Sequence, residues 1–461
     1  MTSRACVAFG LSVIVSVWVT TATNATGADA QRRPTFATDI SPILIEHCAP
    51  CHRPDQAAPF PLLSLDEVRA RSAEIVHATQ SRAMPPWPAI QGPGFPALVD
   101  DRRLTDRQIT AIKTWVTHDM PAGNLRKAPV PPPAPPTWPL GLPDLTIALP
   151  RTVSREAGGP DIARNIVIPV GFPTDLWISA IDYQPGASRV LRHARFFAAP
   201  PDLAVGESDA LPGVGGLLGT GSLENYGDQV LAAGRTLIDL GGWAPGTLRR
   251  MLPAGLAMRV PARANIVMRL YLQPLSIDTS EDGRLAIYFS KPADRRAIVA
   301  IDVPPAFGIA TGLSIPAGDP NYKFTDTFTL PIAVEAIGAR AHAHNLARDM
   351  TLTATSPPPK GTTRGLLKIN PWNPDWPESY FFAEPVRLPA GSTLTTAIVF
   401  DNSTGNPRQL FAPPRVTGWG RMPVGEMPGM TLLIASPSDA DARLLRDAVA
   451  EHLRNQLMKK R

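Results

Sequence analysis

The stretch Ala128-Pro129-Val130-Pro131-Pro132-Pro133-Ala134-Pro135-Pro136 divides the sequence into two parts that differ in periodicity. Six of its nine residues are proline. Proline lacks an amide hydrogen and fixes φ, so such a segment favours an extended polyproline II spacer over helix or sheet. We therefore predict a proline-rich linker over residues 125–142, with one kind of domain before it and another after it.

Before the linker, residues 36–124 have the pattern of a small all-α domain with proline-rich loops. Thr105-Asp106-Arg107-Gln108 fits a helix capping box, in which the threonine and glutamine side chains bond to each other's backbone. Ile109, Ile112 and Val116 then recur at helical spacing. An amphipathic helix is expected to close this domain.

After the linker, the pattern changes to short β-rich runs separated by glycine and proline, which is typical of all-β sandwiches. The chain is long enough for two of them, over residues 143–305 and 306–435, with a cut near Pro304-Pro305. Ser438 is expected to cap a short C-terminal helix within residues 436–461. The clearest β-rich runs are residues 165–170, 176–181, 266–272, 285–289 and 393–400.

Composition excludes several classes of protein. Proline accounts for 52 of the 461 residues, which argues against a mainly helical enzyme, and 44% apolar residues can form real cores. The three cysteines are too few for a disulfide scaffold. The net charge is +5, and no basic run is interleaved with aromatic residues, so nucleic acid is not an expected partner.

The first 30 residues have the layout of a secretory signal peptide. Arg4 precedes an apolar stretch from Ala5 to Val19, and Ala28-Asp29-Ala30 offers a cleavage site after Ala30. An uncleaved anchor is the alternative, although fifteen apolar residues are fewer than a bilayer-spanning helix needs. We expect a periplasmic or secreted protein with no membrane span after cleavage.

Cys48-Ala49-Pro50-Cys51-His52 is a C-x-x-C-H motif, typical of covalent attachment of one c-type haem. The two thiols join the porphyrin and the adjacent histidine binds the iron. Structural zinc is the main alternative, but it normally needs four protein ligands and the sequence has no second cysteine pair. A thioredoxin-like redox motif would need a βαβ pattern, which is absent around these cysteines.

Met84 is the leading candidate for the sixth iron ligand. It lies between the haem motif and the closing helix, and Pro85 favours an extended chain from which its sulfur can point inward. A thioether ligand raises the potential of haem iron. His77 and His118 are rival ligands, and a buried core methionine is the structural alternative.

Residues 36–124 resemble a c-type cytochrome domain found in exported bacterial proteins. The resemblance rests on CAPCHRP from Cys48, followed by APF, MPPW and DRRL. It covers the whole domain and implies His52 and Met84 as the axial ligands of the iron.

Histidine is scarce after the linker, where only His193, His342 and His344 precede the C-terminal helix. His342-Ala343-His344 is H-x-H, and on a strand both imidazoles would lie on one face and could bind one metal ion. Two surface histidines are the alternative. Met427, on a glycine-rich segment, adds a thioether, and two imidazoles with a thioether suit copper.

Three segments in this order resemble the type II copper monooxygenases, typified by peptidylglycine α-hydroxylating monooxygenase and dopamine β-monooxygenase. The resemblance implies two jelly-roll-like β-sandwiches and a hydroxylating copper held by His342, His344 and Met427. The segments are Gly242-Trp243-Ala244-Pro245-Gly246, Ala341-His342-Ala343-His344-Asn345-Leu346 and Glu426-Met427.

The first copper site of that family is where this sequence departs. An adjacent histidine pair and a third histidine on a later strand are expected there. This chain has Arg192-His193 at the pair and Tyr271 at the third position. Two of three imidazoles are missing, so a single copper is expected.

The resulting expectation is an exported haem c and copper oxidoreductase, monooxygenase-like, in which haem donates an electron to a mononuclear copper. The alternative is a periplasmic electron-transfer cytochrome or copper-binding protein without oxygenase activity. A redox partner or small-molecule reductant is expected, together with a small-molecule or peptide substrate whose identity the sequence does not indicate. No catalytic acid, base or nucleophile stands out.

Overall fold

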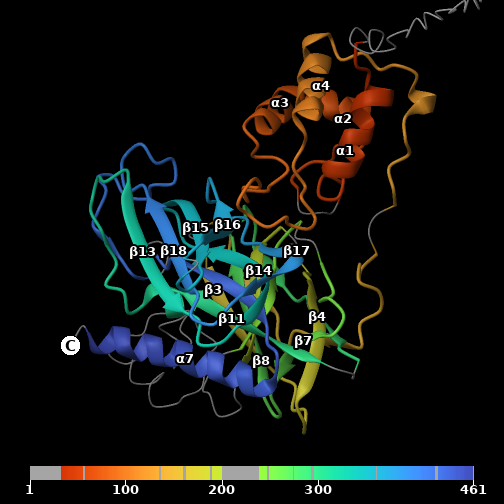
Figure 1. Ribbon diagram of the computed structural model, residues 1–461. Helices are drawn as coiled ribbons and strands as arrows, with labels where there is room; N and C mark the ends of the chain where they lie inside the picture. Colours follow the sequence, from red (N-terminus) through yellow and green to blue (C-terminus); the bar gives the residue numbers. More distant parts are fainter. Residues whose placement is uncertain are drawn as a thin grey trace, which may run out of the picture.

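The computed structural model describes residues 33–54, 58–133, 136–158, 162–186, 189–199, 238–246, 249–273, 275–291, 295–359, 361–420 and 424–459. The chain is mostly β-sheet with few helices, as expected, and a single long helix lies near its C-terminus (Figure 1). The expected signal peptide, residues 1–30, lies outside the described residues.

The helices before the linker form a group that stands apart from the β-rich body in Figure 1. They pack through buried side chains that include Leu44, Ile112 and Trp115. The predicted capping box is confirmed, because the Thr105 and Gln108 side chains each accept the other's backbone N–H. The elements are η2 (Phe36–Ile40), α1 (Ser41–His47), α2 (Leu65–Ala70), α3 (Ser72–Gln80), α4 (Asp106–Thr117) and η3 (Leu125–Lys127).

Two layers of strands form the first sandwich. One is the sheet β3-β8-β5-β6 and the other is the run β1-β10-β4-β7 of a larger sheet. Their apolar faces share a core in which Phe196 and Met268 of one layer join Ile178 and Ile287 of the other. The strands are β1 (Leu145–Ala148), β2 (Val153–Arg155), β3 (Ile162–Pro169), β4 (Leu176–Gln184), β5 (Leu191–Ala199), β6 (Ile238–Trp243), β7 (Leu256–Val260), β8 (Asn265–Leu272), β9 (Thr279–Glu281) and β10 (Arg284–Phe289).

The second sandwich pairs the sheet β13-β18-β15-β16 with the run β11-β20-β14-β17. Leu352 and Ile398 of the first layer share a core with Ile301 and Leu432 of the second. Its elements are β11 (Arg296–Val303), η4 (Pro305–Gly308), β12 (Ser314–Ile315), β13 (Tyr322–Thr329), β14 (Val334–His342), β15 (Ala347–Thr355), β16 (Thr363–Ile369), β17 (Ser379–Leu388), β18 (Thr393–Phe400), β19 (Thr417–Gly418) and β20 (Gly429–Ala435).

One eight-stranded sheet runs through both sandwiches. β7 pairs in parallel with β11 at Leu256 and Ala257, which joins the first run of strands to the second. β11 precedes Pro304-Pro305 in the chain but pairs with β20, so the second sandwich already begins at Arg296. Backbone hydrogen bonds between β7 and β11 therefore join the two sandwiches.

The predicted C-terminal helix is confirmed as α7 (Asp439–Met458), and the Ser438 side chain caps it by accepting the Asp441 N–H. Leu445 lies in the core of the second sandwich, and Leu453 packs against Ile309 and its neighbours. Among the described residues, no helix combines the length and the apolar composition needed to cross a membrane.

The segment from Trp87 to Val99 packs on the β-body, although it lies within the expected helical domain. Trp87 and Leu98 belong to the core of the second sandwich. Ala89 forms a β-bridge with Ile369 at the end of β16, and Leu98 forms one with Phe382 of β17. Residues between α3 and α4 thus attach the helical group to the body.

Candidate metal sites

The C-x-x-C-H motif continues directly from α1 as a tight turn. The backbone N–H groups of Cys51 and His52 both donate to the Cys48 carbonyl, at 3.1 and 2.8 Å. Both thiols are free and partly buried. The His52 Nδ1–H donates to the Phe60 carbonyl at 3.1 Å, so its Nε2 lone pair is available to a metal.

Burial keeps the three groups of this motif uncharged. It raises the pKa of the Cys48 thiol to about 12, and the nearby Cys51 adds to the rise. The pKa of Cys51 is also raised by burial, while Arg102 and Arg249 oppose the rise. Burial lowers the pKa of His52, although the bond to Phe60 opposes it. A neutral imidazole with a free Nε2 beside two free thiols fits covalent haem.

The rival sixth ligands differ in their exposure. Met84 lies half-buried in the turn after α3, where its N–H donates to the Ala78 carbonyl at 3.1 Å. His77 on α3 and His118 at the end of α4 are both exposed. Of these three side chains, Met84 is the least exposed, since it is half-buried and the two histidines are exposed.

His342 and His344 lie close together, with ring centroids 5.7 Å apart and ring planes at 79°. Two imidazoles whose nitrogens lie about 2 Å from one ion can adopt such a separation. His342 ends β14, but His344 lies beyond the strand. The expected strand geometry of H-x-H thus holds only for the first histidine, because the chain turns away from the sheet after it.

Glu426 holds this turn by two hydrogen bonds. Its carboxylate accepts the backbone N–H of His344 and that of Leu346, both at 2.7 Å. The side chain is 1% exposed, and burial raises its pKa to about 7 although both N–H donors oppose the rise. The sequence showed Glu426 only as the neighbour of Met427, and no pattern indicated that it would bond to the histidine loop.

The ring of His344 is oriented by a backbone carbonyl. Its Nδ1–H donates to the Gly425 carbonyl at 2.7 Å, which leaves Nε2 free. The Trp372 indole N–H also donates to the His344 carbonyl, at 3.0 Å. Histidines that bind metals usually donate their other ring N–H in this way, because the bond fixes tautomer and orientation.

The segment with Met427 lies beside this pair. In the register of β14 with β20, His342 lies opposite Gly429. Gly429 is two residues after Met427, and the Met427 side chain is buried. The His342 ring contacts Phe307 with centroids 4.9 Å apart. Burial, then His344, holds the pKa of His342 well below its usual value. Burial also lowers the pKa of His344 to about 4, so both imidazoles are neutral, the form that binds copper.

His193 lies at the position where the resemblance led us to expect the first copper site. Its ring stacks on Tyr271 with centroids 4.0 Å apart, and the two residues pair across β5 and β8. Its Nδ1 is buried and has no hydrogen-bond partner among the described residues. Arg192 instead forms an ion pair with Asp375 at 2.6 Å. Burial, then Arg195, lowers the pKa of His193 to about 3.

Within the described part of the chain, no group of three or more histidine, cysteine, aspartate or glutamate side chains is arranged to hold a metal ion. The proposed copper ligands include two side chains of these types, and the third donor is a thioether. Any copper bound here would thus depend on the sulfur of Met427 as well as on the two imidazoles.

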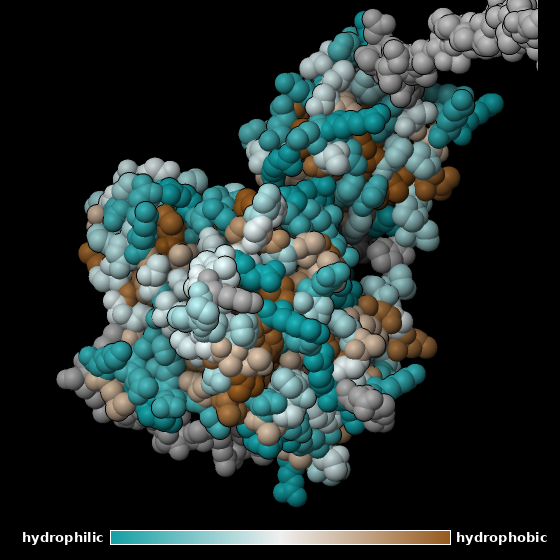
Figure 2. Space-filling view, in the orientation of Figure 1, coloured by the Kyte–Doolittle hydropathy of each residue, from teal (hydrophilic) through white to brown (hydrophobic). Residues whose placement is uncertain are grey.

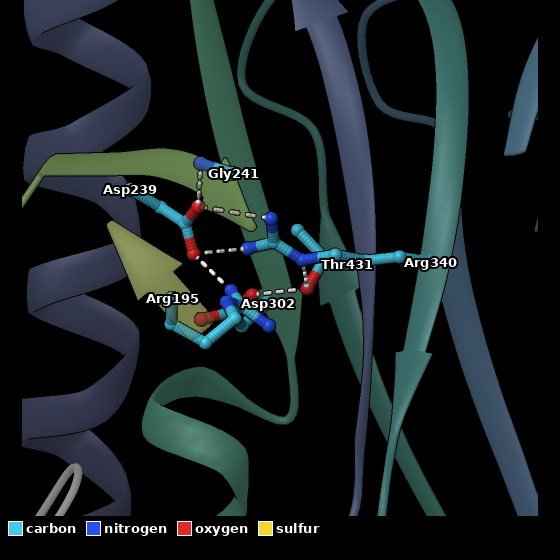
Figure 3. Close-up of polar contacts among 6 residues, drawn as sticks. All are labelled: Arg195, Asp239, Gly241, Asp302, Arg340 and Thr431. Carbon is cyan, nitrogen blue, oxygen red and sulfur yellow. Dashed lines mark hydrogen bonds and ion pairs between the residues drawn. The ribbon is translucent and has the colours of Figure 1, made fainter. Parts of the chain in front are cut away.

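A buried polar network joins the two sandwiches (Figure 3). Asp239 of β6 accepts two bonds from Arg340 of β14, at 2.6 and 3.1 Å, and forms an ion pair with Arg195 of β5. Asp302 of β11 accepts a bond from the Thr431 hydroxyl of β20 at 2.5 Å. No spacing in the sequence indicated this network, because its members come from five strands.

This network holds the strands that carry the histidines. Arg340 and His342 are two residues apart on β14, as are His193 and Arg195 on β5, so each pair shares one face of its strand. Asp239 forms ion pairs with both Arg195 and Arg340, which places the two strand faces near each other.

A cavity of about 320 Å³ lies between the two sandwiches beside this network. It is large enough for a small organic molecule. The residues that line it include Trp243, Phe307, Arg340, Glu378 and Leu453 of α7. The space-filling view shows apolar and polar side chains mixed over the face of the β-body (Figure 2).

Comparisons with known proteins do not place the chain in a family. No family profile and no curated protein matches it. Among solved structures, N-glycanase F (PNGase F) has a TM-score of 0.27 and 10% identity, covering 64% of this chain and 97% of that one. PNGF-II has a TM-score of 0.28 and 10% identity, covering 62% and 64%. The infectious bursal disease virus VP2 subviral particle has a TM-score of 0.19 and 13% identity, covering 66% and 78%. Such low TM-scores carry no inference about function.

Proposed function

We propose that this chain is an exported oxidoreductase of the monooxygenase type, in which a covalent haem donates an electron to one copper ion. The observation that carries the proposal is the local geometry of H-x-H. His344 is locked by the Gly425 carbonyl with Nε2 free, next to a second neutral imidazole and the segment of a buried methionine. This arrangement suits copper better than a solvated surface pair, because His344 is only 8% exposed.

If haem binds here, Cys48 and Cys51 would supply the thioether bonds. His52 and Met84 would be the axial ligands of the haem iron. The helical group would then be a c-type cytochrome domain. Haem bound there supplies one-electron transfer. The chain's own residues keep His52 neutral, direct its Nδ1–H to the Phe60 carbonyl and leave Met84 half-buried.

For copper, His342, His344 and Met427 would be the ligands. Copper bound there supplies the reaction of dioxygen with a C–H bond. Glu426 fixes the loop that carries His344, and the Asp239 network holds β14 against β5. The inter-sandwich cavity would hold the substrate away from bulk water.

The electron count requires a second redox centre. Hydroxylation consumes R–H, O₂, two electrons and two protons and yields R–OH and water. One copper stores one electron, and the first copper site of the resembling family is reduced here to His193. Haem in the same chain would supply the second electron, and an external redox partner or small-molecule reductant would replenish both.

The isolated His193 also favours a second candidate function. A chain with one imidazole at the first copper site could have lost oxygen chemistry and retained electron transfer or copper binding. This alternative predicts the same haem and copper content as the monooxygenase proposal. The two candidates therefore differ only in whether the protein forms hydroxylated product.

Turnover measurements separate the two candidates. Reduced holoprotein is mixed with dioxygen and a panel of small molecules and peptides, and oxygen uptake, peroxide and hydroxylated product are measured together. If the chain is an oxygenase, hydroxylated product should be lost in His344→Ala and in Cys51→Ser. It should be retained in Glu335→Gln, which changes a partly exposed ion pair with Arg296. Haem oxidation at equal rates with and without copper, and no product across the panel, would favour the electron-transfer protein.

A further inference from the structure

The second haem cysteine lies directly against the β-body. A Cβ built on Gly246 would lie 2.7 Å from the Cys51 Sγ, closer than any real contact of this kind. Gly246 has a φ of +75°, in the left-handed region that favours glycine. The preceding Trp243 and Ala244 are buried. The Trp243–Gly246 loop, which we call the docking loop, therefore meets the sulfur with its bare backbone.

Arg102 fixes the docking loop from the side of the helical group. Its guanidinium donates to the Gly246 carbonyl at 2.6 Å and forms an ion pair with Glu378, just before β17. The two charged side chains are only 19% and 11% exposed. Since water screens such a pair weakly, it holds better than a surface ion pair.

Further contacts join the helical group to the β-body. Arg250, just after the docking loop, forms an ion pair with Asp100 of the helical group's connecting segment. The backbone N–H of Ile90 donates to the Lys368 carbonyl at 2.8 Å, and that of Val99 to the Phe381 carbonyl at 3.0 Å. These contacts give the helical group one fixed position on the body.

The contact between the helical group and the β-body lies next to the cavity that leads to the candidate copper site. Trp243 of the docking loop and Glu378 of the ion pair line the inter-sandwich cavity. Phe307, whose ring contacts His342, also lines that cavity. One cavity thus connects the surroundings of Cys51 with a direct neighbour of the proposed copper ligand.

We propose that the docking loop contacts the edge of a covalently bound haem at which Cys51 is attached, and that Arg102 holds the docking loop in place. The inference rests on the proposed function, because it assigns positioning roles to Gly246 and Arg102 in transfer from haem to copper. In that step one electron would pass from the haem iron, oxidised from ferrous to ferric, to the copper, reduced from copper(II) to copper(I). No bond forms or breaks and no proton moves.

The test uses the mature protein with its covalent haem, once loaded with copper and once free of copper. Gly246→Ala puts a methyl group against the Cys51 sulfur and should displace the helical group. Gly171→Ala is the matched control, because Gly171 also has a positive φ, +60°, but a Cβ there meets nothing within 4 Å. Arg102→Gln is the second variant, since it removes the ion pair without adding bulk.

Two readouts are measured. The first is the anaerobic rate at which flash-reduced haem is reoxidised by copper(II), at several protein concentrations. The second is the haem reduction potential in copper-free protein, which does not depend on activity. We expect a concentration-independent rate that falls severalfold in Gly246→Ala and in Arg102→Gln, with a lower potential because water reaches the haem edge. Gly171→Ala should match the unmodified protein.

Rates and potentials in Gly246→Ala and Arg102→Gln equal to those of Gly171→Ala would overturn the docking inference while leaving the proposed function intact. If Gly246→Ala does not fold, Arg102→Gln alone decides. A protein without covalent haem at Cys48 and Cys51 would instead refute the proposed function itself.

Discussion

Replacing Asp239 by asparagine tests the network that holds the two sandwiches together. Asp239 pairs with Arg195 and Arg340, and the three side chains are 14%, 15% and 7% exposed. The Asp239→Asn variant would keep the shape of the side chain but leave both guanidinium groups without their carboxylate. Breaking a buried ion pair from one side costs about 3–5 kcal/mol. We expect a loss of that size, a large fraction of the ~5–15 kcal/mol that stabilises a typical domain.

Chemical denaturation followed by tryptophan fluorescence and circular dichroism measures this loss. Glu335→Gln is the control, because Glu335 and its partner Arg296 are 28% and 39% exposed and such surface pairs contribute about 0–1 kcal/mol. If Asp239→Asn costs no more than Glu335→Gln, the network does not hold the sandwiches, and the reasoning from burial is wrong.

Three further predictions concern the histidines and Met84. Met84→Ala should lower the haem reduction potential and change the visible spectrum, because the soft ligand that favours ferrous iron is lost; an unchanged spectrum would point to His77, His118 or a vacant position. His344→Ala should lose copper to a modest chelator, as metal analysis after dialysis would show, whereas His193→Ala should retain it; equal copper in both would contradict the ligand assignment. In metal-free protein, the pKa of His193 is lowered from 6.5 to about 3, so the unfolded chain takes up its proton at higher pH than the folded one. The free energy of unfolding should therefore fall as pH drops below 6.5, and less so in a His193→Asn variant; identical pH dependences would contradict the burial of this ring.

The sequence predicted those features that depend on local patterns. The capping box at Thr105 and Gln108 and the C-terminal helix after Ser438 depend on residues three or four positions apart, and the structure confirms both. The β-rich runs after the linker likewise indicated sandwiches. Local signals did not indicate that β7 and β11 would join the sandwiches into one sheet, because strand pairing between distant segments leaves no spacing pattern.

The segment after α3 shows the same limit. Trp87 and Leu98 read as part of the helical domain because they lie between its helices in the chain. Their segment instead pairs with β16 and β17, where an apolar core and unpaired strand edges were available. The position of Trp87 and Leu98 depends on tertiary contacts with the β-body. Only the structure shows that their segment connects the helical group to the β-body.

At the candidate copper site, the sequence named the donor types but not what orients them. His342, His344 and Met427 could be singled out because histidine is scarce and the H-x-H spacing is short. Glu426 accepts the backbone N–H of His344 and the Gly425 carbonyl accepts its ring N–H, and both residues lie about 80 positions away in the chain. Such contacts have no signature in the residue types themselves.

Metal content and spectra of the purified mature protein test the central claim most directly. The account predicts one haem that stays attached in acidified acetone and on a denaturing gel, together with one copper per chain with a type II electron paramagnetic resonance signal and nitrogen couplings from two imidazoles. Haem that is lost on denaturation, or a protein that binds no copper when His342, His344 and Met427 are all present, would contradict it.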